Sequence, residues 1–155
     1  MTMNLNGTTG IVLPTAAAPA FSAYINTNQS VTSGVAVKAQ INTKEFDTNN
    51  NYDSTTNYRF TPTVAGYYQI NGSVAAATTG ACFAVCYLYK NGAAYKNGNY
   101  TNNSNGANIT VSSIVYFNGT TDYVELWAYI VGTSPTISGT TSVTTYLNGC
   151  YLRSA

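Results

Sequence analysis

The chain has 155 residues, enough for one domain with a buried core, and 45% of them are hydrophobic, which excludes a disordered chain. Charged residues make up only 7% and the formal net charge is +1, so a nucleic-acid partner is not expected. The chain contains no histidine, which excludes Ser-His-Asp, Cys-His and histidine-metal sites. We therefore expect a folded protein that is not an enzyme.

The first 19 residues contain no Lys or Arg, so they lack the basic start of a signal peptide. No apolar run in the chain is long enough to span a membrane. These features predict synthesis in a cytoplasm without membrane insertion. We expect a short attachment segment at 1–19, followed by a single domain at 20–155.

From residue 20 onward, apolar residues alternate or form short runs, and no segment has the spacing of an amphipathic helix. The pattern predicts an all-β protein with a two-sheet sandwich or jelly roll. Turns are expected at four Asn-Gly pairs, Asn91-Gly92, Asn97-Gly98, Asn105-Gly106 and Asn118-Gly119. The expected strands cover 20–25, 35–41, 58–61, 66–77, 81–90, 108–117, 122–131 and 142–152.

Two of these strands are apolar on both faces. In 122–131, Val124, Leu126, Ala128 and Ile130 are assigned to the core, and in 81–90 the core face starts at Cys82. A monomer with one core would leave the opposite faces exposed, so we expect a subunit interface there. Tyr and Trp are favoured at interfaces because they combine apolar area with a polar tip. The expected interface residues are Tyr87, Tyr89, Trp127 and Tyr129.

The cysteines form an odd set of three, Cys82, Cys86 and Cys150. Two of them lie four residues apart in one expected strand and cannot bridge each other without a turn. We expect all three to be buried, reduced thiols.

The carboxylates of Glu45 and Asp47 are close in sequence, a spacing that a glycosidase pair could have. A solvated loop, or a salt bridge to Lys44 or Arg59, is the favoured interpretation.

Four segments in order resemble the globular head of C1q, within the C1q/TNF-like jelly-roll family. They are 20–23 (AFSA), 49–68 (NNNYDSTTNYRFTPTVAGYY), 88–92 (LYKNG) and 147–152 (LNGCYL). The resemblance implies a ten-strand jelly roll that assembles as a homotrimer and serves recognition. The turn at 119–122 is longer than the family's, which leaves Asp122 as an open candidate for a calcium ligand. No other cofactor is expected. The hallmark positions of the second segment are Tyr52, Asp53, Phe60, Pro62, Gly66 and Tyr68.

Residues 4–14, NLNGTTGIVLP, resemble a short segment that precedes C-terminal domains in bacteriophage tail-fibre and other virion proteins. This resemblance implies a homotrimeric virion protein of a tail fibre or head fibre, bound to other virion proteins through residues 1–15. Its expected location is the virion.

Residues 95–108 and 48–57 are rich in amides and hydroxyls, with isolated tyrosines. As loops, they would contact a polysaccharide or a protein on the host surface. The candidate ligand-binding residues are Tyr52, Tyr95, Tyr100, Asn102 and Asn103. Two alternatives stay open: a capsid or tail decoration trimer with no receptor, and a bacterial C1q-like adhesin or lectin.

Overall fold

The computed structural model describes residues 4–6, 10–12, 18–139 and 143–155, and within them every regular element is a β-strand. No helix that could cross a membrane is found in this part of the chain. The strands are β1 (Asn4–Asn6), β2 (Gly10–Val12), β3 (Ala20–Tyr24), β4 (Gln29–Ser30), β5 (Ala36–Lys38), β6 (Thr43–Asp47), β7 (Tyr52–Asp53), β8 (Arg59–Phe60), β9 (Gly66–Lys90), β10 (Ala93–Phe117), β11 (Val124–Ile137) and β12 (Tyr146–Arg153).

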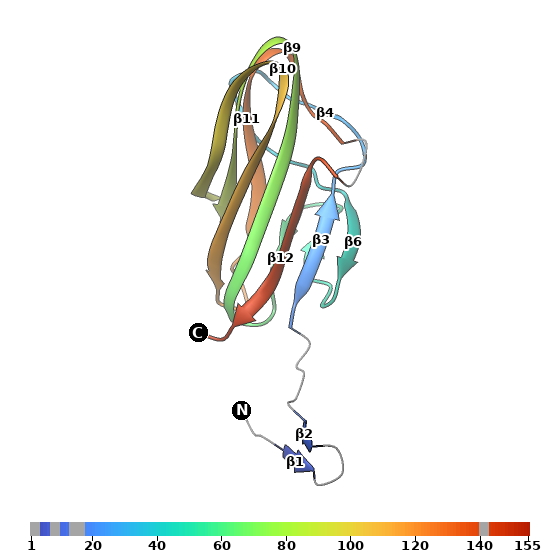
Figure 1. The fold of residues 1–155 in the computed structure, drawn as a ribbon, viewed down its shortest axis with the longest axis vertical. Coiled ribbons are helices and arrows are strands. Elements are labelled where there is room, and N and C mark those ends of the chain that lie inside the picture. The colour runs from blue at the N-terminus through green and yellow to red at the C-terminus, as the bar shows by residue number, and fades with distance from the viewer. Residues whose placement is uncertain (1–3, 7–9, 13–17, 140–142) are drawn as a thin grey trace.

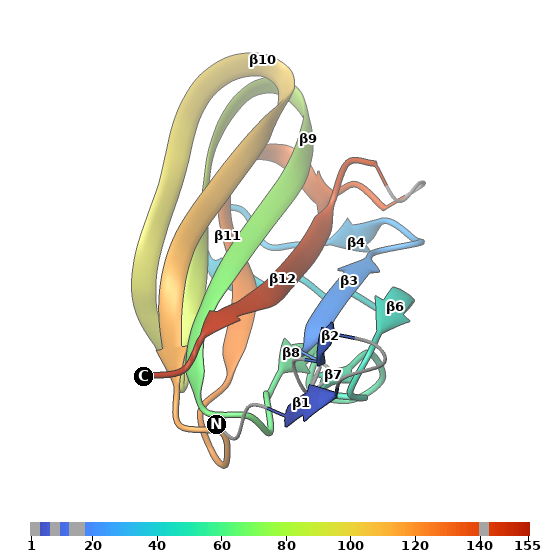
Figure 2. The same cartoon turned by 60° about the horizontal axis from the view of Figure 1, so that its bottom comes forward.

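Two long strands, β9 and β10, run through both layers of the fold and curve over one end of the molecule (Figures 1 and 2). β12 pairs with residues 67–73 of β9, whereas β11 pairs with residues 76–90 of the same strand. The first layer therefore has the order β6, β3, β12, β9, β10. In the second layer β10, β9 and β11 are neighbours, and β11 also pairs with β4, β5 and β8. This arrangement confirms the all-β, two-sheet jelly roll.

The expected loop at 95–108 is wrong, because β10 continues unbroken from Ala93 to Phe117 opposite β9. Asn91-Gly92 does form the turn between them, with φ of 53° and 81°. Asn97-Gly98 and Asn105-Gly106 instead lie at shifts of register within β10. Asn and Gly serve β-bulges as readily as turns, so the sequence signal alone did not separate the two.

Hallmark residues of the C1q-like pattern build an aromatic core at one end of the sandwich. Phe60 stacks on Phe21 with ring centroids 4.1 Å apart, and it meets Tyr68 and Phe117 edge to face. Gly66 begins β9 with φ +152°, and a Cβ there would lie 2.5 Å from the carbonyl oxygen of Arg153. Only glycine fits this close approach of β9 to the end of β12.

The strand faces assigned from the alternation are confirmed. Val124, Leu126, Ala128 and Ile130 of β11 are buried, and so are the alternate residues of β9 from Cys82 to Leu88.

The cysteines follow the expectation only in part. Cys82 and Cys86 are buried, and burial raises the pKa of the Cys86 thiol to about 12. The expectation of a third buried thiol is wrong, because Cys150 lies on the outer side of β12 and is exposed.

β1 and β2 form a small antiparallel hairpin, with Asn4 opposite Val12 and Asn6 opposite Gly10. This hairpin is a separate sheet that lies apart from the jelly roll (Figure 1). The first strand of the jelly roll, β3, begins at Ala20. The boundary at residue 19 and the attachment role of 1–15 both stay predictions, and much of that segment lies outside the described residues.

Candidate functional site

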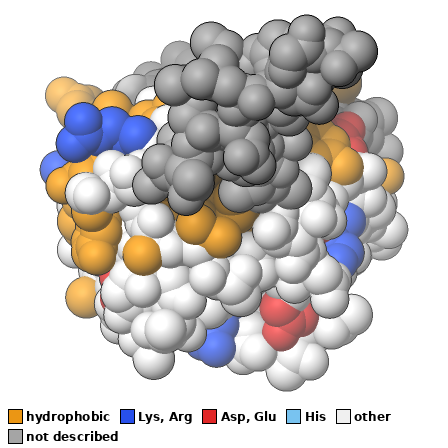
Figure 3. Space-filling view, turned by 90° about the horizontal axis from the view of Figure 1, so that it is seen from below, with side chains coloured by type: hydrophobic (Ala, Val, Ile, Leu, Met, Phe, Trp, Pro, Cys, Tyr) orange, Lys and Arg blue, Asp and Glu red, His pale blue; other side chains and the backbone are white. Residues whose placement is uncertain are grey.

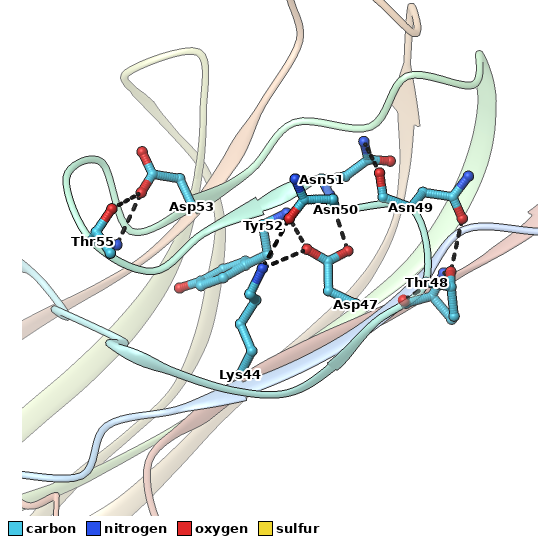
Figure 4. A network of polar contacts seen from close by, with 10 residues as sticks. Lys44, Asp47, Thr48, Asn49, Asn50, Asn51, Tyr52, Asp53 and Thr55 are labelled. Atoms are coloured by element: carbon cyan, nitrogen blue, oxygen red, sulfur yellow. Dashed lines mark hydrogen bonds and ion pairs between the residues drawn. The ribbon is translucent and has the colours of Figure 1, made fainter.

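A polar hollow of about 470 Å³ lies where the loop after β6 meets the β7–β8 hairpin. Its wall includes most of the predicted contact loop 48–57, together with residues from β6 and β8. Figure 4 shows part of the hydrogen-bond network that surrounds this loop. The lining residues are Lys44, Asn50, Asn51, Tyr52, Asp53, Ser54, Thr55, Asn57, Arg59, Thr61 and Thr63.

Asp47, at the end of β6, holds one side of the hollow in place. Its carboxylate accepts hydrogen bonds from the backbone N–H groups of Asn51 (3.0 Å) and Tyr52 (2.9 Å). Lys44 Nζ lies 3.5 Å from Asp47 Oδ2 and donates a hydrogen bond to Asn50 Oδ1 at 3.0 Å (Figure 4). The predicted salt bridge to Lys44 is therefore confirmed. The Asp47 carboxylate is nearly buried, and its hydrogen bonds to the backbone of the following loop set the shape of that loop.

Asp53 organises the opposite side, in the β7–β8 hairpin. It accepts hydrogen bonds from the backbone N–H groups of Thr56, Thr55 and Asn57, and from the side chains of the last two. These bonds, first of all those from Thr56 and Thr55, hold the pKa of the Asp53 carboxyl well below its usual range. Asp53 is therefore a structural anion whose oxygens are already engaged by its own loop.

Arg59 faces Asp53 across the hairpin, since the two residues are register partners in β8 and β7. No ion pair joins Arg59 to a carboxylate in the described part of the chain. Its guanidinium instead lies over the ring of Tyr123, 4.2 Å from the centroid. The salt bridge expected for the Glu45 and Asp47 carboxylates is therefore the one from Lys44 to Asp47, and Arg59 takes no part in it.

Two residues beside the hollow have a left-handed backbone, and in one of them, Tyr58, this conformation is unusual. Asn50 has φ of 53°, and Tyr58, which precedes Arg59, has φ of 49°. A bulky residue rarely adopts this left-handed conformation, and such strain is concentrated at functional sites.

Tyr52 cannot serve as a stacking surface for a ligand, which corrects the sequence expectation. Its side chain is only 3% exposed, with the ring stacked on Phe21 at 5.3 Å and the hydroxyl donating to the carbonyl oxygen of Ile41 at 3.2 Å. Burial raises the pKa of Tyr52 above its usual range. A Tyr in a short strand beside the core is a core residue here, and the alternation of a two-residue strand was too short to reveal this.

The other four predicted ligand residues lie on the first half of β10, and none of them lines the hollow. Tyr100 is 74% exposed, and its ring lies 6.2 Å from that of Phe83 on β9. Asn102 pairs with Phe83 and so shares this outer face, whereas Asn103 pairs with the core-facing Cys82. Tyr95 is also exposed, near the β9–β10 turn. The structure therefore does not bring the five predicted residues into one site.

The residues predicted at the subunit interface lie together on the outer face of the second layer. Trp127 stacks on Tyr89 with centroids 4.4 Å apart and donates from Nε1 to Glu125 Oε2 at 2.9 Å. Lys38 pairs with the same carboxylate at 3.0 Å. All four aromatic residues are half-buried within the single chain. Their role as an interface stays a prediction.

A more exposed apolar patch lies on the outer face of the first layer. Tyr67 and Tyr116 are register partners, and Ile114, Leu152 and Tyr116 are 56%, 48% and 40% exposed. Tyr67, Ile114, Leu152 and Arg153 line a shallow hollow of about 240 Å³. Seen from below, hydrophobic side chains gather on one side of the molecule (Figure 3). Sequence reasoning missed this patch, although the alternation around Val115 could have indicated it.

Asp122 links the turn between β9 and β10 to the turn before β11, at one end of the sandwich. Its carboxylate accepts from Asn91 Nδ2 (2.7 Å) and from the backbone N–H of Asn118 (3.1 Å), and it pairs with Lys90 at 3.1 Å. Burial alone would raise its pKa, but the bonds from Asn91 and Lys90 lower the pKa below the usual value. Donors rather than oxygen ligands surround this carboxylate, and the described residues hold no cluster of three or more His, Cys, Asp or Glu side chains that could bind a metal. The calcium role stays untested.

The two layers, with long strands shared between them, define the jelly roll of the TNF and C1q domains. Murine APRIL has a TM-score of 0.59 at 10% identity, over 87% of this chain and 99% of that one. The globular domain of zebrafish complement C1qA has a TM-score of 0.61 at 18% identity, over 89% and 99%. The TNF protein Eiger from S. frugiperda has a TM-score of 0.62 at 8% identity, over 89% and 94%. No protein-family model and no curated protein matches the sequence. The fold is therefore TNF/C1q-like.

Proposed function

We propose that this chain is a homotrimeric recognition protein of a bacteriophage virion, placed on a tail fibre or a head fibre, that binds a glycan or a protein on the host surface. The polar hollow beside β7 and β8 carries the proposal. It is formed largely by the amide- and hydroxyl-rich loop that the sequence assigned to contact, and it sits on a rigid jelly roll. Neutral donors and acceptors of this kind suit hydroxyl-rich surfaces.

The trimer is supported by the exposed patch of Tyr67, Ile114, Tyr116 and Leu152. Apolar side chains this exposed and this close together favour burial against another protein surface. The C1q-like resemblance makes a second copy of the chain the partner. A homotrimer would bury the patch three times over in a closed assembly.

The test is adsorption to host cells by particles that carry variants of this protein. Ser54→Tyr, which fills the hollow, should abolish adsorption without changing particle assembly, whereas deletion of residues 1–15 should abolish incorporation into the particle. A glycan array with the purified chain should give a hit that Ser54→Tyr loses. Tyr100→Ala, measured in the same adsorption and array experiments, tests whether the outer face of β10 contributes to binding of the host surface.

A decoration trimer without a receptor is the second candidate, since the apolar patch by itself requires only self-association. Under that function, adsorption would be unchanged by Ser54→Tyr and Tyr100→Ala, and the particle would instead lose stability when the protein is removed. A host range that does not depend on any residue of the hollow would contradict the recognition role.

A further inference from the structure

We propose that the hollow binds an acidic saccharide, with Arg59 holding the sugar carboxylate and the surrounding amides and hydroxyls holding the ring hydroxyls. The inference rests on the proposed function and deepens it, because it specifies the chemical class of the ligand.

The charges of the hollow single out Arg59. Two of the six basic residues of the chain line this one hollow, Lys44 and Arg59. Lys44 is paired with Asp47, and the Asp53 carboxylate is engaged by the donors of its own loop. Arg59 is the lining cation with no carboxylate partner among the described residues.

The position of Arg59 suits a planar anion. Tyr123 lies against the face of the guanidinium at 4.2 Å, a contact that leaves the N–H groups at the edge of the group available as donors. Within the described part of the chain, no salt bridge engages this guanidinium. A guanidinium matches a carboxylate through two parallel hydrogen bonds, which an ammonium group cannot reproduce.

The remaining lining groups suit a sugar ring. Ser54 and Thr61 present hydroxyl groups, which both donate and accept hydrogen bonds as sugar hydroxyls do. Asn57 adds its Oδ1 as an acceptor, since its Nδ2 already donates to Asp53. The hollow is polar and open to solvent, so a unit within a longer polysaccharide could enter it from the side. A neutral sugar would leave Arg59 without an anionic partner.

The experiment measures binding of oligogalacturonate and of its carboxyl-reduced counterpart to the full chain by calorimetry. We expect the uronate to bind about tenfold more tightly than the reduced sugar and more weakly as salt is raised. Arg59→Gln should lower the uronate affinity about tenfold. Arg59→Lys should have an affinity between those of the unmodified chain and Arg59→Gln, because lysine keeps the charge but cannot form two parallel hydrogen bonds to a carboxylate. Lys96→Gln is the matched control, since it removes one positive charge from β10 outside the hollow.

Equal binding of the uronate and the reduced sugar, or equal affinity of Arg59→Gln and Lys96→Gln, would overturn the inference. Tighter binding of a phosphate-bearing polymer such as teichoic acid would overturn the assignment to a carboxylate. Thermal unfolding checks that each variant is folded, and Ser54→Tyr provides a block of the hollow that leaves Arg59 in place. Particles with Arg59→Gln that adsorb fully while Ser54→Tyr particles do not would refute the acidic ligand but leave the proposed function standing.

Discussion

Asn99 Oδ1 accepts a hydrogen bond from the backbone N–H of Thr110 at 2.6 Å, which ties the first half of β10 to its second half. The two halves belong to different layers, and each is the edge strand of its own sheet. An unpaired row of N–H groups on an edge strand is a template for aggregation. The Asn99 side chain therefore closes the sandwich along the side where both edges meet.

Replacing Asn99 with Ala should lower the free energy of unfolding by about 1 kcal/mol, because the Thr110 N–H loses its protein partner. Chemical denaturation measures this change. Asn103→Ala is the control, since Asn103 is an exposed amide on the same strand. Equal effects of the two substitutions would contradict the closing role of Asn99.

Gly98 should tolerate no side chain, because a Cβ would collide with the Thr110 carbonyl and lie 2.7 Å from Cys86 Sγ. We expect Gly98→Ala to destabilise the fold by about 3 kcal/mol or to prevent folding. Gly80→Ala should cost only about 1 kcal/mol, since φ there is +81° but nothing lies within 4 Å of a Cβ. Thermal unfolding of the two variants tests this ranking, and a more stable Gly98→Ala would show that the β10 crossing is looser than described.

Substitutions on the outer faces of the two layers should have different effects on the solution mass. Light scattering of the unmodified chain should give three times the 16.4 kDa of one chain. The double variant Ile114→Ser with Leu152→Ser should give a monomer, because it removes the exposed apolar patch. Val35→Ser, an equally exposed position beside the second layer, is the control and should stay trimeric.

Trp127→Ala should keep the trimer but lose about 2 kcal/mol of stability, because the stack on Tyr89 and the hydrogen bond to Glu125 disappear. An interface at Trp127, as expected from the sequence, would instead give a monomer or an aggregate from this variant. A folded monomer from Trp127→Ala, with a trimer from the double variant, would place the interface where the sequence put it.

Tyr52→Phe should cost about 1 kcal/mol of stability, because the hydroxyl loses its hydrogen bond to the Ile41 carbonyl. The buried ring should leave binding of any surface ligand unchanged. Denaturation and the glycan array measure the two effects separately. Loss of binding in a fully stable Tyr52→Phe protein would restore Tyr52 as a contact residue.

Asp53 should make the stability depend on acid pH. Its pKa is lowered in the folded chain, so the stabilisation is present above the unfolded value of about 3.9 and is lost as the pH falls below it. The melting temperature of the unmodified chain should therefore drop in this range, and Asp53→Asn should show a shallower drop. Identical pH profiles for the two proteins would show that the Asp53 loop contributes nothing to acid stability.

Much of the fold could be predicted because β-strands leave a local signal. The alternation in β9 and β11 identified the core faces correctly, and the order of Phe60, Gly66 and Tyr68 identified the jelly roll. The candidate site was predicted only in part. The loop 48–57 does line the hollow, but Arg59 was considered only as a salt-bridge partner, since its orientation depends on Tyr123, more than sixty residues away.

The sequence by itself determined the strand periodicity, the low charge and the lack of histidine, because these are properties of composition and near neighbours. Only the tertiary structure decided that 95–108 is a strand and not a loop, since a run of Asn and Gly acquires its conformation from the partner strand β9. Tertiary packing also buried Tyr52 against Phe21 and left Ile114 exposed. Which outer face is covered depends on how the layers lie against each other, and that relation joins residues far apart in the chain.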